Sequence, residues 1–333
     1  MKINRQELLD QVVSVRPGLS QREVIEQSSC VVFQDQRIIT FNDEVACSRK
    51  SILDIKAAVV AEPFIQLLSR LKEETIEVII EGEELRIKAG KKKAGIRMES
   101  EILLPVESLE KPEKWNKLPK DFGDAVYLVS RCAGKKESEF VMTCVHLHPK
   151  WIEASDNYQA GRYNIQMGID TSFLIRSESL GMVESLDMRK FSQTKNWIHF
   201  KNSSGLILSF RKYLDKYPEI SKVMKKKGTP LTLPKGIKDS VENAQIFSDE
   251  NAEDKKIQIQ LKGKILRLKA DGASGWYEEP LKISYAGSEL SFRIDPKLLI
   301  SLTEKSSQST VGTDRMIVQT GKFRYVTVLI VSD

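Results

Sequence analysis

The chain has 333 residues, of which 41% are hydrophobic and 29% charged, and its formal net charge is +6. This composition is typical of a globular protein of two to three domains and excludes a chain too polar to bury a sizeable core. The mild surplus of Lys and Arg is too small to prove a nucleic-acid partner, but it allows a basic surface on one side.

Helix patterns and β-hairpin patterns alternate from the N-terminus to the C-terminus. Amphipathic helices are predicted over residues 5–15, 60–72, 120–134, 171–186, 235–248 and 295–305. Hairpins are predicted to begin near Cys30, Ile76, Val141, Trp197, Ile257 and Met316, with Gly or a polar pair at the turns. Asp170 and Asp295 are expected to cap the helices that follow them.

The order of helix, strands, helix and strands occurs three times, at an offset of roughly 110 to 120 residues, which is longer than the period of solenoid repeats. Lys- and Pro-rich linkers are expected at 110–120 and 222–235. We therefore predict three domains, at residues 1–116, 117–228 and 229–333. The repetition indicates pseudo-symmetry and a closed ring, whereas the simpler interpretation is an α+β array without a shared purpose.

The N-terminal and cysteine patterns bear on the cellular compartment. The segment MKINRQELLD lacks an apolar signal core, and no run approaches 18 apolar residues. Cys30, Cys47, Cys132 and Cys144 form no C-x-x-C pair, and buried thiols in a reducing compartment fit them. We expect a soluble cytoplasmic protein.

An ordered set of short segments resembles a known family. These segments are FNDEVACS (41–48), LLPVESLEKPEKW (103–115), EASDNYQAGRY (153–163), FRKYLDKYPEISKVM (210–224), ENAQIFS (242–248) and YVTVLIV (325–331). Together they resemble the DNA sliding clamps, specifically the beta subunit of bacterial DNA polymerase III, over essentially the whole chain. Residues 157–160 and the chain end depart from the family pattern, as a divergent clamp of a phage or mobile element would.

The resemblance implies an α+β fold of three tandem clamp domains, each with two helices on the inner face and antiparallel sheets outside. Two chains would close head to tail into a homodimeric ring of six domains around double-stranded DNA, without reading its sequence. The implied function is that of a processivity factor at replication forks on the nucleoid. It would tether the replicative polymerase and the clamp loader through their short linear motifs.

The resemblance also implies three sets of site residues. DNA contacts are expected from basic residues of the helix-lined hole: Arg5, Arg16, Arg22, Arg70, Lys72, Lys120, Arg131, Lys135, Lys136, Arg176, Lys235, Lys238, Lys297 and Lys305. The partner-peptide pocket is expected at Met142, Ser155, Asn157, Tyr158, Gln159, Ala160, Tyr217, Pro218, Lys222, Val223, Leu329, Ile330 and Val331. The dimer seam is expected to join Ile246 and Phe247 to Leu104, Val106 and Leu109.

The sequence carries none of the common motifs of catalysis. The sequence has no P-loop, no G-x-S-x-G elbow and no G-x-G-x-x-G loop. His146 and His148 share one strand face, but no third ligand follows at a recognisable spacing, so we predict no metal and no cofactor. A binding protein is favoured over an enzyme. The alternative is a clamp-fold interaction scaffold or replication regulator that does not encircle DNA.

Overall fold

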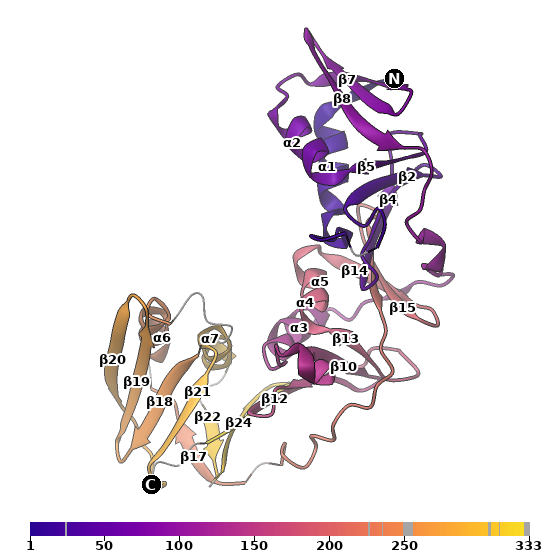
Figure 1. Cartoon of the computed structure of the whole chain (residues 1–333). Coiled ribbons are helices and arrows are strands. Elements are labelled where there is room, and N and C mark those ends of the chain that lie inside the picture. The colour runs from indigo at the N-terminus through magenta and orange to yellow at the C-terminus, as the bar shows by residue number, and fades with distance from the viewer. Residues whose placement is uncertain are drawn as a thin grey trace. The chain divides into compact units, whose positions relative to one another are not determined.

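The computed structural model describes residues 1–23, 25–225, 227–234, 236–248, 256–305, 308–312 and 314–329 (Figure 1). The chain forms two compact units. The first comprises Met1–Leu118 and Met182–Tyr213, and the second comprises Pro119–Gly181 and Leu214–Asp333. Each unit thus combines two separate stretches of sequence, and the division into three domains remains a prediction.

The first unit is built on a twelve-stranded antiparallel sheet. Its order is β1-β6-β7-β8-β5-β2-β3-β4-β16-β15-β14-β9. The strands are β1 (Lys2–Asn4), β2 (Cys30–Gln34), β3 (Arg37–Phe41), β4 (Val45–Lys50), β5 (Ala57–Val60), β6 (Thr75–Glu81), β7 (Glu84–Ala89), β8 (Lys92–Glu99), β9 (Asn116–Lys117), β14 (Met188–Gln193), β15 (Trp197–Asn202) and β16 (Ile207–Arg211).

Two helices of the first unit, α1 (Arg5–Ser14) and α2 (Ala61–Arg70), pack against each other. Figure 1 shows them side by side. The side chain of Asn4 caps α1 by accepting the amide proton of Glu7 at 2.9 Å. Leu8 and Val12 of α1, and Phe64 and Leu68 of α2, are fully buried, so each helix places one apolar face on the core. The short α5 (Met182–Ser185) and the 3₁₀ helices η1 (Arg16–Gly18) and η2 (Val106–Ser108) complete this unit.

The second unit contains an eight-stranded and a four-stranded antiparallel sheet. The orders are β13-β10-β11-β12-β24-β23-β22-β17 and β20-β19-β18-β21. The strands are β10 (Cys144–His148), β11 (Trp151–Ser155), β12 (Gln159–Asn164), β13 (Phe173–Arg176), β17 (Thr229–Thr232), β18 (Ile257–Lys262), β19 (Ile265–Gly272), β20 (Gly275–Lys282), β21 (Leu290–Ile294), β22 (Gln308–Val311), β23 (Arg315–Thr320) and β24 (Phe323–Val328).

The helices of the second unit pack in pairs on these sheets. Helix α3 (Phe122–Ser130) contacts the short α4 (Ser177–Leu180), and α6 (Ile237–Gln245) contacts α7 (Pro296–Lys305). The Asp295 carboxylate accepts the amide proton of Leu298 at 2.8 Å, which confirms the predicted cap of α7. A 3₁₀ segment, η3 (Glu137–Thr143), precedes β10.

The main error of the sequence prediction lies at residues 171–186, which do not form one helix. Phe173–Arg176 forms β13, which pairs with β10, and Asp170 therefore does not cap a helix. Only 177–180 and 182–185 are helical, and Gly181 separates them. The apolar, partly β-branched run of Phe173, Leu174 and Ile175 is fully buried in the sheet, and that packing overrides the helical periodicity.

The six predicted hairpins are all present: β2–β3, β6–β7, β10–β11, β15–β16, β18–β19 and β23–β24. Only the third begins later than predicted, at Cys144, because Val141 belongs to η3. The other five predicted helices are also present, with ends that differ by a few residues from the prediction.

Two strand pairs connect parts of the chain that are far apart in sequence. In the first unit β4 pairs with β16, and in the second unit β12 pairs with β24, both antiparallel. Each pair joins two neighbouring thirds of the chain into one continuous sheet, so two edges that a separate domain would expose are covered. None of the helices that the structure describes is long and apolar enough to cross a membrane.

Candidate nucleic-acid interface and partner surfaces

Four of the expected DNA contacts lie on or next to the helix pair of the first unit, and their surroundings differ. The Arg5 guanidinium donates to the backbone oxygens of Leu68, at 2.9 Å, and Glu73, at 3.2 Å, and so fastens α1 to the end of α2. Arg16 forms an exposed ion pair with Glu62 at 3.1 Å. Arg70 and Lys72 are exposed at the C-terminal end of α2, where the helix dipole stabilises cations.

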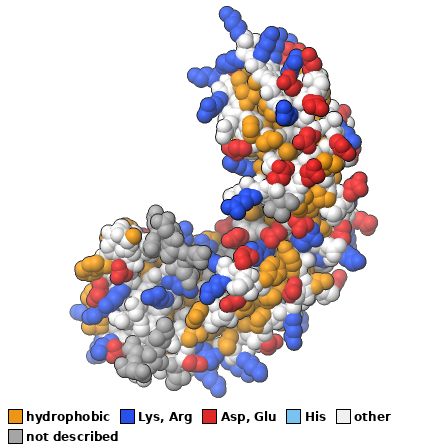
Figure 2. Space-filling view, in the orientation of Figure 1, with side chains coloured by type: hydrophobic (Ala, Val, Ile, Leu, Met, Phe, Trp, Pro, Cys, Tyr) orange, Lys and Arg blue, Asp and Glu red, His pale blue; other side chains and the backbone are white. Residues whose placement is uncertain are grey.

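Among the residues described, six expected DNA contacts are exposed and have no acidic partner: Arg22, Arg70, Lys72, Lys120, Lys136 and Lys297. Figure 2 shows Lys and Arg side chains over the margin of the first unit near α2. Such side chains are available to phosphate oxygens without first breaking an ion pair. Lys238, in contrast, is 2.7 Å from Glu304, so a phosphate would have to compete with that carboxylate.

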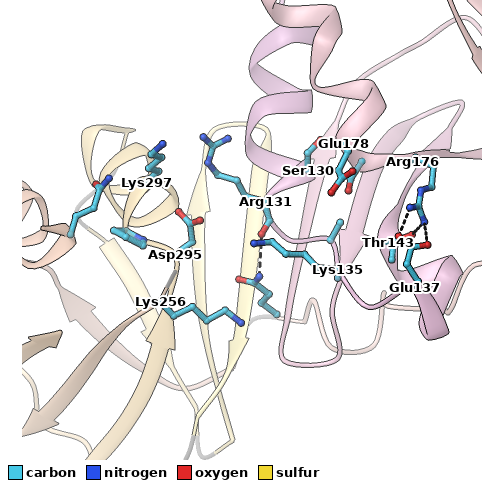
Figure 3. A pocket seen from close by; sticks show the side chains of 16 residues that line it. Ser130, Arg131, Lys135, Glu137, Thr143, Arg176, Glu178, Lys256, Asp295 and Lys297 are labelled. Carbon is cyan, nitrogen blue, oxygen red and sulfur yellow. Dashed lines mark hydrogen bonds and ion pairs between the residues drawn. The ribbon is translucent and has the colours of Figure 1, made fainter. Parts of the chain in front are cut away.

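A cavity of about 360 Å³ in the second unit gathers further cations (Figure 3). The end of α3, the start of α7 and the segment before β18 supply Arg131, Lys297 and Lys256, and Lys135 also lines the cavity. The carboxylates in the lining are Glu137, Glu178 and Asp295, and the last is already used as the cap of α7. Cationic side chains outnumber carboxylates in the lining, which favours an anionic ligand.

Arg176 lines the same cavity but is held by the protein itself. It forms an ion pair with Glu137 and donates to the Thr143 hydroxyl at 2.7 Å, as the dashed lines in Figure 3 show. The hydrogen bond from Arg176 also lowers the pKa of Glu137. Arg131 lies over the ring of Tyr127, 3.7 Å from its centroid, and donates to the Tyr127 backbone oxygen. Both guanidinium groups are therefore fixed in place, Arg176 by a carboxylate and Arg131 by an aromatic face.

Four of the expected site residues cannot be placed. Lys235, Ile330 and Val331 lie outside the described residues, and so does the side chain of Lys305.

The turn between β11 and β12 presents part of the expected partner pocket. The Asp156 carboxylate accepts the amide protons of Tyr158, at 3.0 Å, and Gln159, at 2.8 Å, while Asn157 adopts a left-handed φ of 73°. This turn leaves Tyr158 67% exposed. It also buries Gln159, which donates to the Arg131 backbone oxygen and accepts from the Tyr325 hydroxyl. Met142, Asn157 and Tyr158 line one small cavity of about 150 Å³.

The apolar floor beneath Ala160 is built largely by residues that the sequence prediction omitted. Ala160 packs in one cluster with Ile220, Met224, Ile317 and Val326. Ile220 and Met224 stand four residues apart on the segment after β16, and the alternation along β23 and β24 was the available signal for the other two. This floor is therefore built by three separate parts of the chain: the β12 strand, the segment after β16, and strands β23 and β24.

The other expected pocket residues surround this cluster or lie beside it. Val223 is 37% exposed, and Pro218 and Lys222 are exposed, whereas Leu329 and Ser155 are buried. Tyr217 is buried against the ring of His146, with 5.0 Å between the centroids. His146 also contacts the buried Glu153 carboxylate at 2.8 Å, and that carboxylate pairs with Arg162. No group of three or more potential metal ligands was found within the described ranges.

The residues expected at the dimer seam fall into two kinds. Leu104 is only 3% exposed and packs with Phe41 and Trp197, and Val106 and Leu109 pack partly buried against the same core. Burial therefore does not support a contact between Leu104 and a second chain. In the second unit, Ile246 is 67% exposed at the end of α6, and Phe247 stacks on Tyr277 of β20. Trp276, which the prediction omitted, is 72% exposed on β20, an edge strand of its sheet.

Solved structures with the same architecture were found over the full length of the chain. A putative DNA polymerase III beta subunit from Eubacterium rectale matches with a TM-score of 0.78 and 13% identity, covering 99% of this chain and 98% of that one. The DNA polymerase III beta chain from Streptococcus pneumoniae matches with a TM-score of 0.76 and 16% identity, covering 99% of both. The DNA polymerase III subunit beta from Pseudomonas aeruginosa matches with a TM-score of 0.75 and 15% identity, covering 100% of both.

The chain has the sliding-clamp fold. Because the likeness spans the whole chain, the clamp fold accounts for the recurrence of helices and hairpins in each third of the sequence. No family model and no curated protein matches the chain.

Proposed function

We propose that the protein is a DNA sliding clamp, a processivity factor without enzymatic activity of its own. Two chains close head to tail around double-stranded DNA in the cytoplasm, at replication forks on the nucleoid. The ring tethers the replicative polymerase and receives its loader through short linear motifs. The observation that carries the proposal is the clamp fold over the full chain length, combined with exposed cations at helix ends.

The proposed DNA contact is electrostatic and independent of sequence. The exposed cations Arg70, Lys72 and Lys297 stand at helix ends, and the cavity beside Arg131 adds a cationic surface. Contacts of this kind bind phosphates but carry no information about the bases, which permits sliding. Arg5 acts chiefly in fastening α1 to α2, so we place it behind this surface rather than on it.

The proposed partner site is the region around the β11–β12 turn and the cluster under Ala160. Tyr158 and Val223 offer exposed apolar surface beside the buried cluster of Ile220 and Met224. A short peptide with a hydrophobic anchor suits a surface of this kind. The proposed seam between the two chains uses Ile246, Phe247 and the free edge of β20, since an unpaired edge strand is a template for pairing with another chain.

The proposal is tested by loading the protein onto nicked circular DNA with a bacterial clamp loader and isolating the complex at high salt. We expect retention on the circle and release once the circle is cut, because the link is topological. Equal retention on circular and linear DNA, or none on either, would support the alternative of an interaction scaffold. The matched control is the charge-reversed variant Arg70→Glu with Lys72→Glu. This variant is expected to weaken low-salt binding to linear DNA and to lower the salt dependence of that binding.

A further inference from the structure

A second cavity, of about 510 Å³, lies in the first unit, and its lining shares no residue with α1, α2 or the partner surface proposed above. One wall is the sheet, which contributes Ile39 of β3 and Ile207 of β16. The segment 106–115 contributes Val106, Leu109 and Trp115 to the lining. The volume lies within the range of cavities that accept a small ligand or a bulky side chain.

The segment that roofs this cavity is fastened on both sides, so the cavity does not depend on a partner to form. Before the cavity, Leu104 is anchored in the core of the unit. Beyond it, the Glu110 carboxylate accepts from the backbone and the side-chain amide of Asn196, both at 2.9 Å. Lys201 then lies over the ring of Trp115, 5.6 Å from its centroid. The walls are formed before a ligand binds, and such preorganisation lowers the entropic cost of binding.

The charged groups of the lining are the carboxylates Asp35, Glu107 and Glu110 and the cations Arg37 and Lys111. The side-chain oxygen of Gln34 is buried in the wall and has no hydrogen-bond partner among the described residues. At the rim, the exposed carboxylates of Asp35 and Glu107 have no ion-pair partner within the same residues. Arg37, the guanidinium on this rim, already donates to the Ser48 hydroxyl at 2.8 Å. Since a buried acceptor without a donor is unfavourable, the site is matched to a ligand that brings N–H groups.

We propose that this cavity binds a short linear peptide of a partner protein, with one large apolar side chain on Ile39, Val106 and Leu109. A Lys or Arg next to that side chain pairs with Asp35 and Glu107, and a peptide N–H donates to Gln34. With three carboxylates against the two cations Arg37 and Lys111 in the lining, the charge favours a basic peptide over the phosphates of a nucleic acid. The proposal does not require a closed ring, and it assigns Val106 and Leu109 to a partner pocket instead of the dimer seam.

The test is a panel of fluorescein-labelled nonapeptides in a Gly-Ser background. Two central positions vary over Leu, Ile, Met, Phe, Tyr and Trp, and the next position is Lys, Ser or Glu. Fluorescence anisotropy with the full-length protein ranks their affinities. We expect peptides with an aromatic residue and Lys to bind about tenfold more tightly than their Glu counterparts, since close charge pairs contribute this much.

Two variants and a control decide the site. Ile39→Trp fills the cavity and is expected to lower the affinity of the best peptide at least about tenfold, because the apolar anchor side chain can no longer enter. Asp35→Lys with Glu107→Lys is expected to reverse the preference between Lys and Glu peptides. The control, Val223→Trp, alters the other partner surface. It is expected to leave the affinity of the best peptide and the preference between Lys and Glu peptides unchanged.

Three outcomes overturn the inference: no peptide of the panel binds, the preference for Lys survives in the double variant, or only Val223→Trp weakens binding. The last result would place the peptide on the surface proposed for the polymerase. Retention on DNA circles is measured for the same variants, so that a failure of this inference is distinguished from a failure of the clamp proposal. An unchanged circular dichroism melting curve shows that Ile39→Trp is folded.

Discussion

At the scale of single residues, His199 has the clearest energetic consequence. Its ring is 1% exposed and is held by the hydroxyls of Ser209, at 2.8 Å, and Thr194, at 3.2 Å. Burial lowers the pKa of His199 to about 4. The unfolded chain binds a proton here below about pH 6.5, whereas the folded chain does so only near pH 4. The stability contributed by the neutral ring is therefore complete above about pH 6.5 and is lost as the pH falls toward 4.

The lowered pKa of His199 predicts how the variant His199→Gln responds to acid, because glutamine cannot take up the proton. Between pH 7.5 and 4.5, the parent protein should lose about 2 kcal/mol more unfolding free energy than the variant does. Urea unfolding at the two pH values, followed by circular dichroism, measures the difference. His148→Gln serves as the control, since His148 is only partly buried beside Trp151 and should alter the acid sensitivity less. Equal losses in the parent and His199→Gln would contradict the argument.

At the scale of elements, the junction of β12 with β24 depends on Gly161. This residue is paired with Tyr325, and a Cβ at its position would lie 2.6 Å from the Cys132 sulfur and 3.0 Å from the Phe323 ring. Both neighbours are fully buried. Gly161→Ala is therefore expected to lower the free energy of unfolding by about 1 to 3 kcal/mol through overpacking.

The measurement is the urea midpoint, with Gly181→Ala as the matched control. Gly181 has a right-handed helical backbone, and a Cβ there would have its nearest contact at 3.5 Å, an ordinary van der Waals distance. We expect this variant to unfold within about 0.5 kcal/mol of the parent. A stable Gly161→Ala protein would show that β12 can move away from β24 without cost.

The elements themselves were largely predictable, and the exceptions have a common cause. Six hairpins and five of the six helices follow from period and turn residues, because those signals are local. Residues 173–176 were assigned wrongly because their partner, β10, lies some thirty positions earlier and no local pattern reports it. Likewise Arg5 looks like any helix-end cation in the sequence, and only the carbonyls of Leu68 and Glu73 reveal its part in joining two helices.

At the scale of the whole molecule, the proposed ring makes the state of association decisive. The chain mass is 37.8 kDa, and light scattering of the purified protein is expected to give twice this value. Replacing Ile246 with Ala and Phe247 with Asp should yield monomers, because a charge at an apolar seam is left without a partner. The control is Ile80→Asp, on an exposed position of β6, which should remain dimeric. An unchanged dimer in the seam variant would refute the assignment of the seam.

The partner sites could be predicted only in outline. The turn at 156–159 carries its own sequence signal, whereas Ile220, Met224, Ile317 and Val326 meet only because distant strands pair. The same limit applies to the cavity of the first unit, whose walls are separated by some seventy positions of sequence.

The pairing of β4 with β16 and of β12 with β24 also constrains synthesis on the ribosome. Strands β3 and β4 can form a hairpin early, but β4 acquires its second neighbour only after residue 211 has left the exit tunnel. Strand β12 acquires its neighbour β24 later still, because β24 lies almost at the end of the chain. The nascent chain therefore carries at least one bare strand for most of its translation, and a product terminated after β4 or β12 but before the partner strand keeps such an edge open to aggregation.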